Sequence, residues 1–145
     1  ALATVSRRPE VASFFLLVTS IGVAMGINNS VLFLHLSSLG VSNSVLGMSV
    51  FLTAIAELPF FFYASNLIAY FSARGVVNIA AATMVLRLLY YSLLGPVITN
   101  ADWVLLVEPL HGITFAAMWT ASVTYAEEIA PPGLAVSMQG LCSGL

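Results

Sequence analysis

The first half of the chain contains a run from Val11 to Ala56 without a single Asp, Glu, Lys or Arg. About 20 apolar residues in a helix are enough to cross the hydrocarbon core of a bilayer, so this run has room for two crossings. Soluble domains have roughly 25% charged residues, whereas this chain has 7% and is 60% hydrophobic. The apolar runs do not alternate with polar residues as the strands of an outer-membrane barrel do. The sequence therefore predicts an all-α, polytopic membrane protein.

Short clusters of turn-forming residues divide the sequence into apolar spans. The connections that they predict fall at about 37–44, 71–78 and 95–102. The expected spans are about 13–36, 45–63, 76–94 and 103–126, with a fifth beginning at 134. These spans make up one partial transmembrane domain over residues 1–145. Because the sequence begins without Met and ends inside an apolar run, we expect it to be part of a longer protein.

The arginines indicate which side of the membrane each connection faces. Arg7 and Arg8 precede the first span, and Arg74 lies between the second and the third. The connections 37–44 and 95–102 on the opposite side contain no Lys or Arg. Cytoplasmic loops are enriched in these residues, so the pattern predicts a cytoplasmic N-terminus. It applies equally to a plasma membrane and to an internal membrane.

Four ionisable side chains lie well inside the spans, namely Glu57, Arg87, Glu108 and His111. A charge at mid-bilayer costs about 2.5–3.5 kcal/mol on insertion scales, and such residues face a protein interior or an aqueous cavity. The sequence leaves two interpretations of Glu57 and Arg87 open. They form a buried ion pair that only locks two helices together, or they also serve the transported solute or its coupled ion.

A mixed polar and aromatic stripe runs along the fourth span. At about 100° per residue, one helix face carries Glu108, His111, Phe115, Trp119 and Ser122. Aromatic faces cover the apolar surface of a solute ring, while a few polar groups fix its orientation. A carboxyl group in a low dielectric favours its neutral form, and histidine ionises near neutral pH. Glu108 and His111 are therefore the candidate proton-coupling residues, since such pairs serve as proton relays in transporters.

Two other spans contribute candidate residues. Gly22, Gly26 and Asn29 share a face of the first span, and Tyr91 lies one helical turn after Arg87 in the third. Asn29 and Tyr91 are candidates for the solute path, together with the aromatic residues of the fourth span. The Gly22-x-x-x-Gly26 pattern is typical of close helix packing and less often of a binding surface. The aromatic side chains also fit packing or lipid contact.

Other function classes find little support in the sequence. It contains no His-Glu-x-x-His zinc motif, no Gly-x-Ser-x-Gly elbow and no P-loop. A Glu-x-x-His pair occurs once, whereas di-iron bundles need two such pairs and two further Glu residues. The formal net charge of −2 gives no basic patch for nucleic acid, and the single Cys142 excludes a multi-cysteine metal site. We therefore expect no enzyme activity, cofactor, metal or nucleic-acid partner.

Four segments are distinctive, namely "GMSVFLTAIAELPFFFYASNLI", "LRLLYYSLL", "VEPLHGITFAAMWTASVTYA" and "APPGLAVSMQGL". They resemble segments of the major facilitator superfamily. The resemblance is to the animal branch called domain-containing protein 6-like, which is related to proton-linked sugar and nucleoside symporters. It implies that the spans are helices seven to ten, with the start of eleven, of a twelve-helix transporter. Of the superfamily's loop motif after the second span only Arg74 remains, because Ala69 and Tyr70 replace its acidic–basic pair.

The resemblance also implies a function. A secondary active transporter working by alternating access is expected, with symport of H⁺ and a small polar organic solute, sugar- or nucleoside-like, across a lipid bilayer. Relatives of lactose permease carry an acid on helix eight, Arg on nine, and His with Glu on ten. Glu57, Arg87, Glu108 and His111 occupy the corresponding helices, with the order on helix ten reversed. Arg87 is expected to neutralise either carboxylate in one state. The alternative is a non-transporting membrane receptor or scaffold on the same fold.

Overall fold

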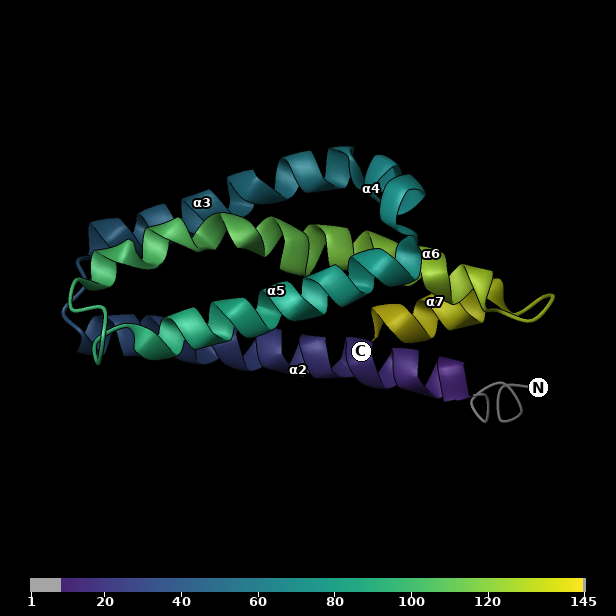
Figure 1. Ribbon diagram of the computed structural model, residues 1–145, viewed down its shortest axis with the longest axis horizontal. Helices are drawn as coiled ribbons and strands as arrows, with labels where there is room; N and C mark the ends of the chain where they lie inside the picture. Colours follow the sequence, from purple (N-terminus) through teal and green to yellow (C-terminus); the bar gives the residue numbers. More distant parts are fainter. Residues whose placement is uncertain (1–8, 145) are drawn as a thin grey trace.

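The computed structural model describes residues 9–144, in which every regular element is a helix (Figure 1). The predicted all-α class is confirmed. The α-helices are α2 (Pro9–Ser38), α3 (Asn43–Phe62), α4 (Ala64–Phe71), α5 (Ala73–Leu93), α6 (Met118–Glu128) and α7 (Ala135–Ser143). Two 3₁₀ helices, η1 (Ala101–Leu106) and η2 (Glu108–Leu110), and one π-helix, η3 (Ile113–Ala117), lead directly into α6. Together η1 to α6 form one long helix, Ala101–Glu128, which we call the fourth helix.

Among residues 9–144, four helices are long and apolar enough to cross a membrane by length and composition. They are α2, α3, α5 and the fourth helix, and each overlaps one of the four expected spans. The α7 helix lies where a fifth span was expected to begin. Arg7 and Arg8, on which the predicted sidedness depends, lie outside the described residues, so the sidedness stays a prediction.

The four long helices lie in a row that does not follow the order of the chain. The α5 helix packs against α2 on one side and the fourth helix on the other, and α3 packs against the far side of the fourth helix. Figure 1 shows α3 and α2 at the two edges of this row, although a short loop joins them. The α7 helix packs against α6. The fourth helix and α5 therefore form the centre of the structure.

The turn before α5 is shorter than the sequence suggests. A connection over 71–78 was expected, but α4 ends at Phe71 and α5 begins at Ala73, so only Ser72 separates them. Ser72 has a φ of +63°, in the left-handed region that few residues other than glycine adopt. Its Oγ accepts a hydrogen bond from the Gly75 N–H at 3.2 Å. This N-cap stabilises a helix start among residues whose polarity had indicated a loop.

Two apolar clusters stabilise the bundle, one toward each end. The larger cluster joins α2, α5, α6 and α7 around residues such as Ala80 and Ala121. The smaller cluster joins the opposite ends of α2, α5 and the fourth helix around Leu36, Leu94 and Val104. Along each of these helices a polar residue lies between the two clusters. The polar layer, as we call it, comprises Asn28, Arg87, Glu108, His111 and Thr114.

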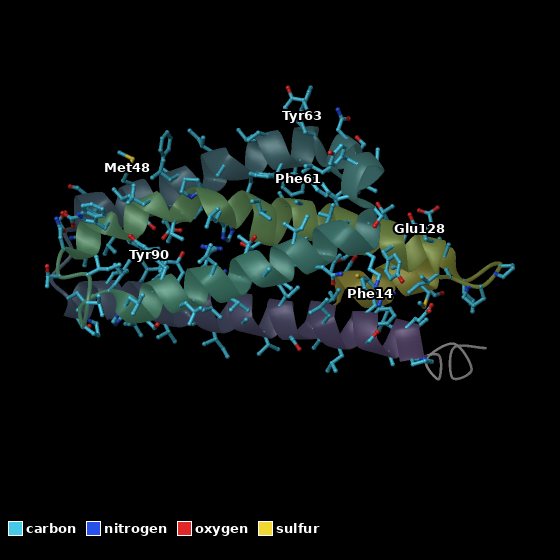
Figure 2. The ribbon with its side chains drawn as sticks, viewed as in Figure 1. Phe14, Met48, Phe61, Tyr63, Tyr90 and Glu128 are labelled. Carbon is cyan, nitrogen blue, oxygen red and sulfur yellow. The ribbon has the colours of Figure 1, made fainter. Side chains whose placement is uncertain are left out.

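Large apolar side chains cover much of the outer surface, especially on α2, α3 and α5. Met48 and Tyr63 point away from the bundle in Figure 2, whereas Phe61 lies between α3 and the fourth helix. Exposed apolar surface on this scale is not stable in water. We therefore expect it to contact lipid or further helices of a longer protein.

The closest helix contact that depends on a glycine is at Gly112, where α3 crosses the fourth helix. A Cβ atom at Gly112 would run into the carbonyl oxygen of Ala56 and the ring of Phe60. We expect Gly112→Ala to lower the free energy of unfolding by about 1–3 kcal/mol, because an added methyl group overpacks the contact. Thermal unfolding of the purified full-length protein measures the effect.

Gly47 in α3 provides a matched control, because a Cβ atom there meets no atom within 4 Å. Gly47→Ala should be neutral or stabilise the protein slightly, since alanine favours a helix more than glycine does. Equal thermal stability of the two variants would contradict the close contact at Gly112.

Candidate functional site

Arg87 of α5 lies at the centre of the polar layer and is 1% exposed. Its Nη1 donates to Thr114 Oγ1 at 2.7 Å. Its Nη2 donates to Tyr91 Oη at 2.8 Å, and its Nε lies 3.2 Å from the same oxygen. Nη2 also forms an ion pair with Glu108 Oε2 at 3.4 Å. The guanidinium therefore connects α5 to the fourth helix through both charge and hydrogen bonds.

Glu108 is equally buried, with 1% of its side chain exposed. The Ser49 hydroxyl of α3 donates to Oε1 at 2.8 Å, which is the shortest contact of this carboxylate. Arg87 Nη2 and the Tyr91 hydroxyl each lie 3.4 Å from Oε2. Three donors thus satisfy a buried carboxylate, as a charge in a low dielectric requires. Glu108 joins three helices, namely α3, α5 and its own.

The neighbours of His111 determine its tautomer. Its Nδ1 lies 3.0 Å from Arg87 Nη1, and arginine can only donate, so Nδ1 accepts this bond. Its Nε2 lies 3.2 Å from Glu57 Oε1. A carboxylate only accepts, so Nε2 carries the proton. The contacts are therefore those of a neutral imidazole that accepts from Arg87 and donates to Glu57.

The direct Glu57–Arg87 ion pair that the sequence suggested is not formed, because Arg87 contacts Glu108 and Glu57 contacts His111. The axial position of α3 explains this arrangement. Ser49 is the α3 residue that bonds to Glu108, and Glu57 lies two turns further along α3, about 12 Å at 1.5 Å per residue. Glu57 is also more accessible, with 24% of its side chain exposed.

Aromatic rings continue from His111 along the fourth helix. The His111 and Phe115 rings stack, with centroids 5.7 Å apart and planes 21° apart. Phe115 and Trp119 follow at 6.3 Å and 32°, and the Phe61 ring of α3 meets Phe115 edge-on at 6.3 Å. In a regular α-helix, positions four apart drift by about 40°. The wider π-turn over Ile113–Ala117 reduces the rotation per residue and offsets part of this drift.

Two cavities lie beside these groups. The polar cavity has a volume of about 200 Å³, and its lining includes Asn28, Asn29, Thr53, Arg87, Glu108 and His111. The aromatic cavity has a volume of about 270 Å³, and its lining includes Gly22, Gly26, Asn29, Phe115, Trp119 and Ser122. Asn29 of α2 lines both. The structure therefore brings the predicted proton-coupling residues to one cavity and four of the five predicted solute-lining residues to the other.

Gly22 and Gly26 line the aromatic cavity, although helix packing was the expected role of this pair. A Cβ atom at Gly26 would meet no atom within 4 Å. Within residues 9–144, then, no helix packs against Gly26. The small side chains on this face of α2 instead leave room for the cavity.

Tyr91 is the predicted solute-lining residue that lines neither cavity. It lies buried beside Arg87 and takes part in the hydrogen bonds of the polar layer. Sequence reasoning missed Ser49 and Thr114, because single hydroxyl side chains are common in membrane helices and carry no distinctive signal. Arg74 lies in the first turn of α5, exposed and away from the polar layer.

Comparison with known proteins identifies the family. The MFS_1 like family, of the major facilitator superfamily, matches residues 1–145. The chain belongs to this family. The predicted family membership is confirmed, and with the apolar helices it makes the chain part of an integral, multi-pass membrane protein.

Individual relatives of this major facilitator chain are only distantly similar. A human protein named major facilitator superfamily domain-containing protein 6-like is 26% identical over 99% of the chain and 24% of its own length. The mouse protein of that name is 29% identical, and the Xenopus laevis protein A form is 26% identical. Each of these two matches covers 86% of the chain and 20% of the relative. The chain thus spans a quarter or less of these relatives, and no solved structure matches it.

Proposed function

We propose that the full-length protein is a secondary active transporter that couples the movement of H⁺ to that of a small polar organic solute by alternating access. Family membership points to a transporter. The observation that carries the proposal is the polar layer itself, in which buried ionisable groups lie inside apolar helices and beside two cavities. Ionisable residues in such a position have a high free-energy cost and typically serve ion or solute pathways.

The charge count of the site favours the binding of one proton. Glu57 and Glu108 supply two negative charges, Arg87 supplies one positive charge, and His111 is neutral. The group therefore has a formal charge of −1 when both carboxyls are ionised. One proton makes it neutral, and neutrality is favourable in a low-dielectric interior.

Proton binding at Glu108 would change the contacts between helices. A protonated carboxyl no longer attracts Arg87 as a counter-charge, so the 3.4 Å ion pair between α5 and the fourth helix weakens. Arg87 keeps its bonds to Thr114 and Tyr91. Loss of the ion pair thus weakens the connection between α5 and the fourth helix without removing it. Such a change in helix contacts is the kind of step that alternating access needs.

His111 is positioned to relay the proton. Its Nε2 faces Glu57, the more exposed carboxylate, and its Nδ1 faces the Arg87 guanidinium. While Arg87 donates to Nδ1, that nitrogen cannot accept a proton. Relay from Glu57 toward Glu108 therefore requires Arg87 to move first, which links proton transfer to the rearrangement.

Transport assays on the full-length protein in liposomes test this proposal. With acidic solution outside and neutral solution inside, we expect a labelled solute from a panel including glucose and adenosine to accumulate above its external concentration. A protonophore should abolish the accumulation. Equilibration without accumulation would overturn proton coupling. No movement of any solute in the panel would contradict transport and is the result expected of a receptor or scaffold.

A further inference from the structure

The two cavities differ in chemistry but share one residue. Besides Asn29, Ser122 and the indole N–H of Trp119, the lining of the aromatic cavity among the described residues is apolar or sulfur-containing. The Ser122 hydroxyl already donates to Met118 Sδ at 3.3 Å, and an indole N–H can only donate. Asn29 is thus the lining residue that offers a donor and an acceptor together. The polar cavity, by contrast, presents Arg87, Glu108 and His111.

The size of the cavities suggests that one solute occupies both. Each is below the roughly 300 Å³ at which pockets for drug-sized ligands begin, whereas the two together exceed it. The row of rings runs from His111, which lines the polar cavity, to Phe115 and Trp119, which line the aromatic cavity. A solute that occupies both cavities lies beside Asn29, which lines both.

We infer that the solute has a planar heteroaromatic ring joined to a hydroxylated group, as a nucleoside has. The ring lies in the aromatic cavity, and the hydroxylated group lies in the polar cavity. This assignment rests on the proposed function, because it takes the two cavities as the binding site of the transported solute. It adds that the solute is heteroaromatic and is not a simple sugar.

The lining of the aromatic cavity favours a heteroaromatic solute over a simple sugar. Phe115 and Trp119 supply aromatic surface that a flat ring contacts favourably, and the methionine sulfurs of Met25 and Met118 make favourable contacts with aromatic rings. A hexose carries hydroxyl groups around its whole ring. In this cavity most of those hydroxyls have no partner, and each unpaired hydroxyl weakens binding.

Asn29 forms hydrogen bonds with the edge of the heteroaromatic ring. Its carboxamide has a donor and an acceptor side by side, which matches the paired acceptor and donor on the edge of a nucleobase. The hydroxylated group then meets charged and hydroxyl side chains in the polar cavity. Proton binding at Glu108 changes the charge that this group experiences, so solute and proton occupancy are coupled.

Equilibrium binding tests the inference without a transport step. Labelled adenosine, uridine and glucose are titrated separately against the full-length protein in nanodiscs with no pH gradient. We expect at least one nucleoside to bind saturably and glucose to bind at least tenfold more weakly. Trp119→Ala should weaken nucleoside binding by about tenfold or more, because base–aromatic stacking contributes strongly. Trp119→Phe should retain most of the affinity.

Matched controls separate a binding role from a general loss of structure. Trp103 is 54% exposed and lines neither cavity, so Trp103→Ala should leave nucleoside affinity unchanged. Asn29→Ala should weaken nucleoside binding, whereas Asn78→Ala, in the first turns of α5, should not. Trp119 is 40% exposed, so its replacement is compatible with folding.

The outcomes distinguish this inference from the proposed function. Nucleoside binding without accumulation in liposomes would overturn coupled transport and leave the solute class standing. Glucose binding as tight as that of both nucleosides, or no binding of either nucleoside, would overturn the solute class. If Trp119→Ala and Trp103→Ala change nucleoside affinity equally, the assignment of the ring to the aromatic cavity is overturned.

Discussion

Replacing Arg87 with methionine should lower the free energy of unfolding of the full-length protein by about 3–5 kcal/mol, because it leaves buried carboxylates without their counter-charge. The polar layer and Glu57 then have a formal charge of −2 in place of −1. Thr114 and Tyr91 also lose the donor that connects them to Glu108. Yield of folded protein and its thermal unfolding in detergent measure the loss.

The double variant Arg87→Met with Glu108→Gln should recover most of this stability. It returns the group to its original charge, and glutamine still accepts the Ser49 hydrogen bond. Arg74→Met is the matched control, since Arg74 is exposed and such surface changes stay within about 0.5 kcal/mol. If Glu57→Gln rescues Arg87→Met and Glu108→Gln does not, Arg87 pairs with Glu57, and the observed arrangement is contradicted.

The helical class and the three ionisable residues of the polar layer were accessible from the sequence. Composition and uncharged runs determine that the chain crosses a membrane, and a period of 3.6 residues puts Glu108 and His111 on one face. Which group each of them contacts was not accessible. That depends on which helices are neighbours and how far each is shifted along its axis. The way in which α3 packs against the fourth helix brings Ser49 into contact with Glu108 and Glu57 into contact with His111.

The glycines illustrate the same limit. Gly22-x-x-x-Gly26 has the spacing of a helix-packing motif, yet no described helix packs against Gly26. Gly112 belongs to no such motif, and it is where the backbone of α3 approaches most closely. A packing motif shows only that a close approach is sterically possible. The position of the partner helix decides whether it occurs.

The π-turn is a further feature without a sequence signal. Nothing in residues 113–117 distinguishes this segment from an ordinary apolar helix. Its effect is nevertheless local to the site, because it helps to keep the rings of His111, Phe115 and Trp119 in one line. Such bulges occur frequently at functional sites in membrane and soluble helices alike. Sequence periodicity alone predicts that these three residues share one helix face, but it does not predict that their rings stack.

Proton coupling through Glu108 is tested most directly by comparing exchange with accumulation in the Glu108→Gln variant. Exchange of a labelled solute across the membrane needs only binding and the conformational change, whereas accumulation also needs release of a proton. Glutamine has the size of glutamate and imitates its protonated form. The variant should fold, because Arg87 and Glu57 then balance each other in charge. Glu127→Gln is the control, since Glu127 is exposed and its side chain accepts a hydrogen bond from Gln139, away from the polar layer.

The measurement uses full-length protein in liposomes and the labelled probe that the parent protein accumulates. We expect Glu108→Gln to exchange internal for external solute at a rate close to that of the parent and to lose accumulation driven by a pH gradient. Glu127→Gln should retain both activities. If Glu108→Gln accumulates solute under the pH gradient as well as the parent does, Glu108 is not the proton-coupling residue.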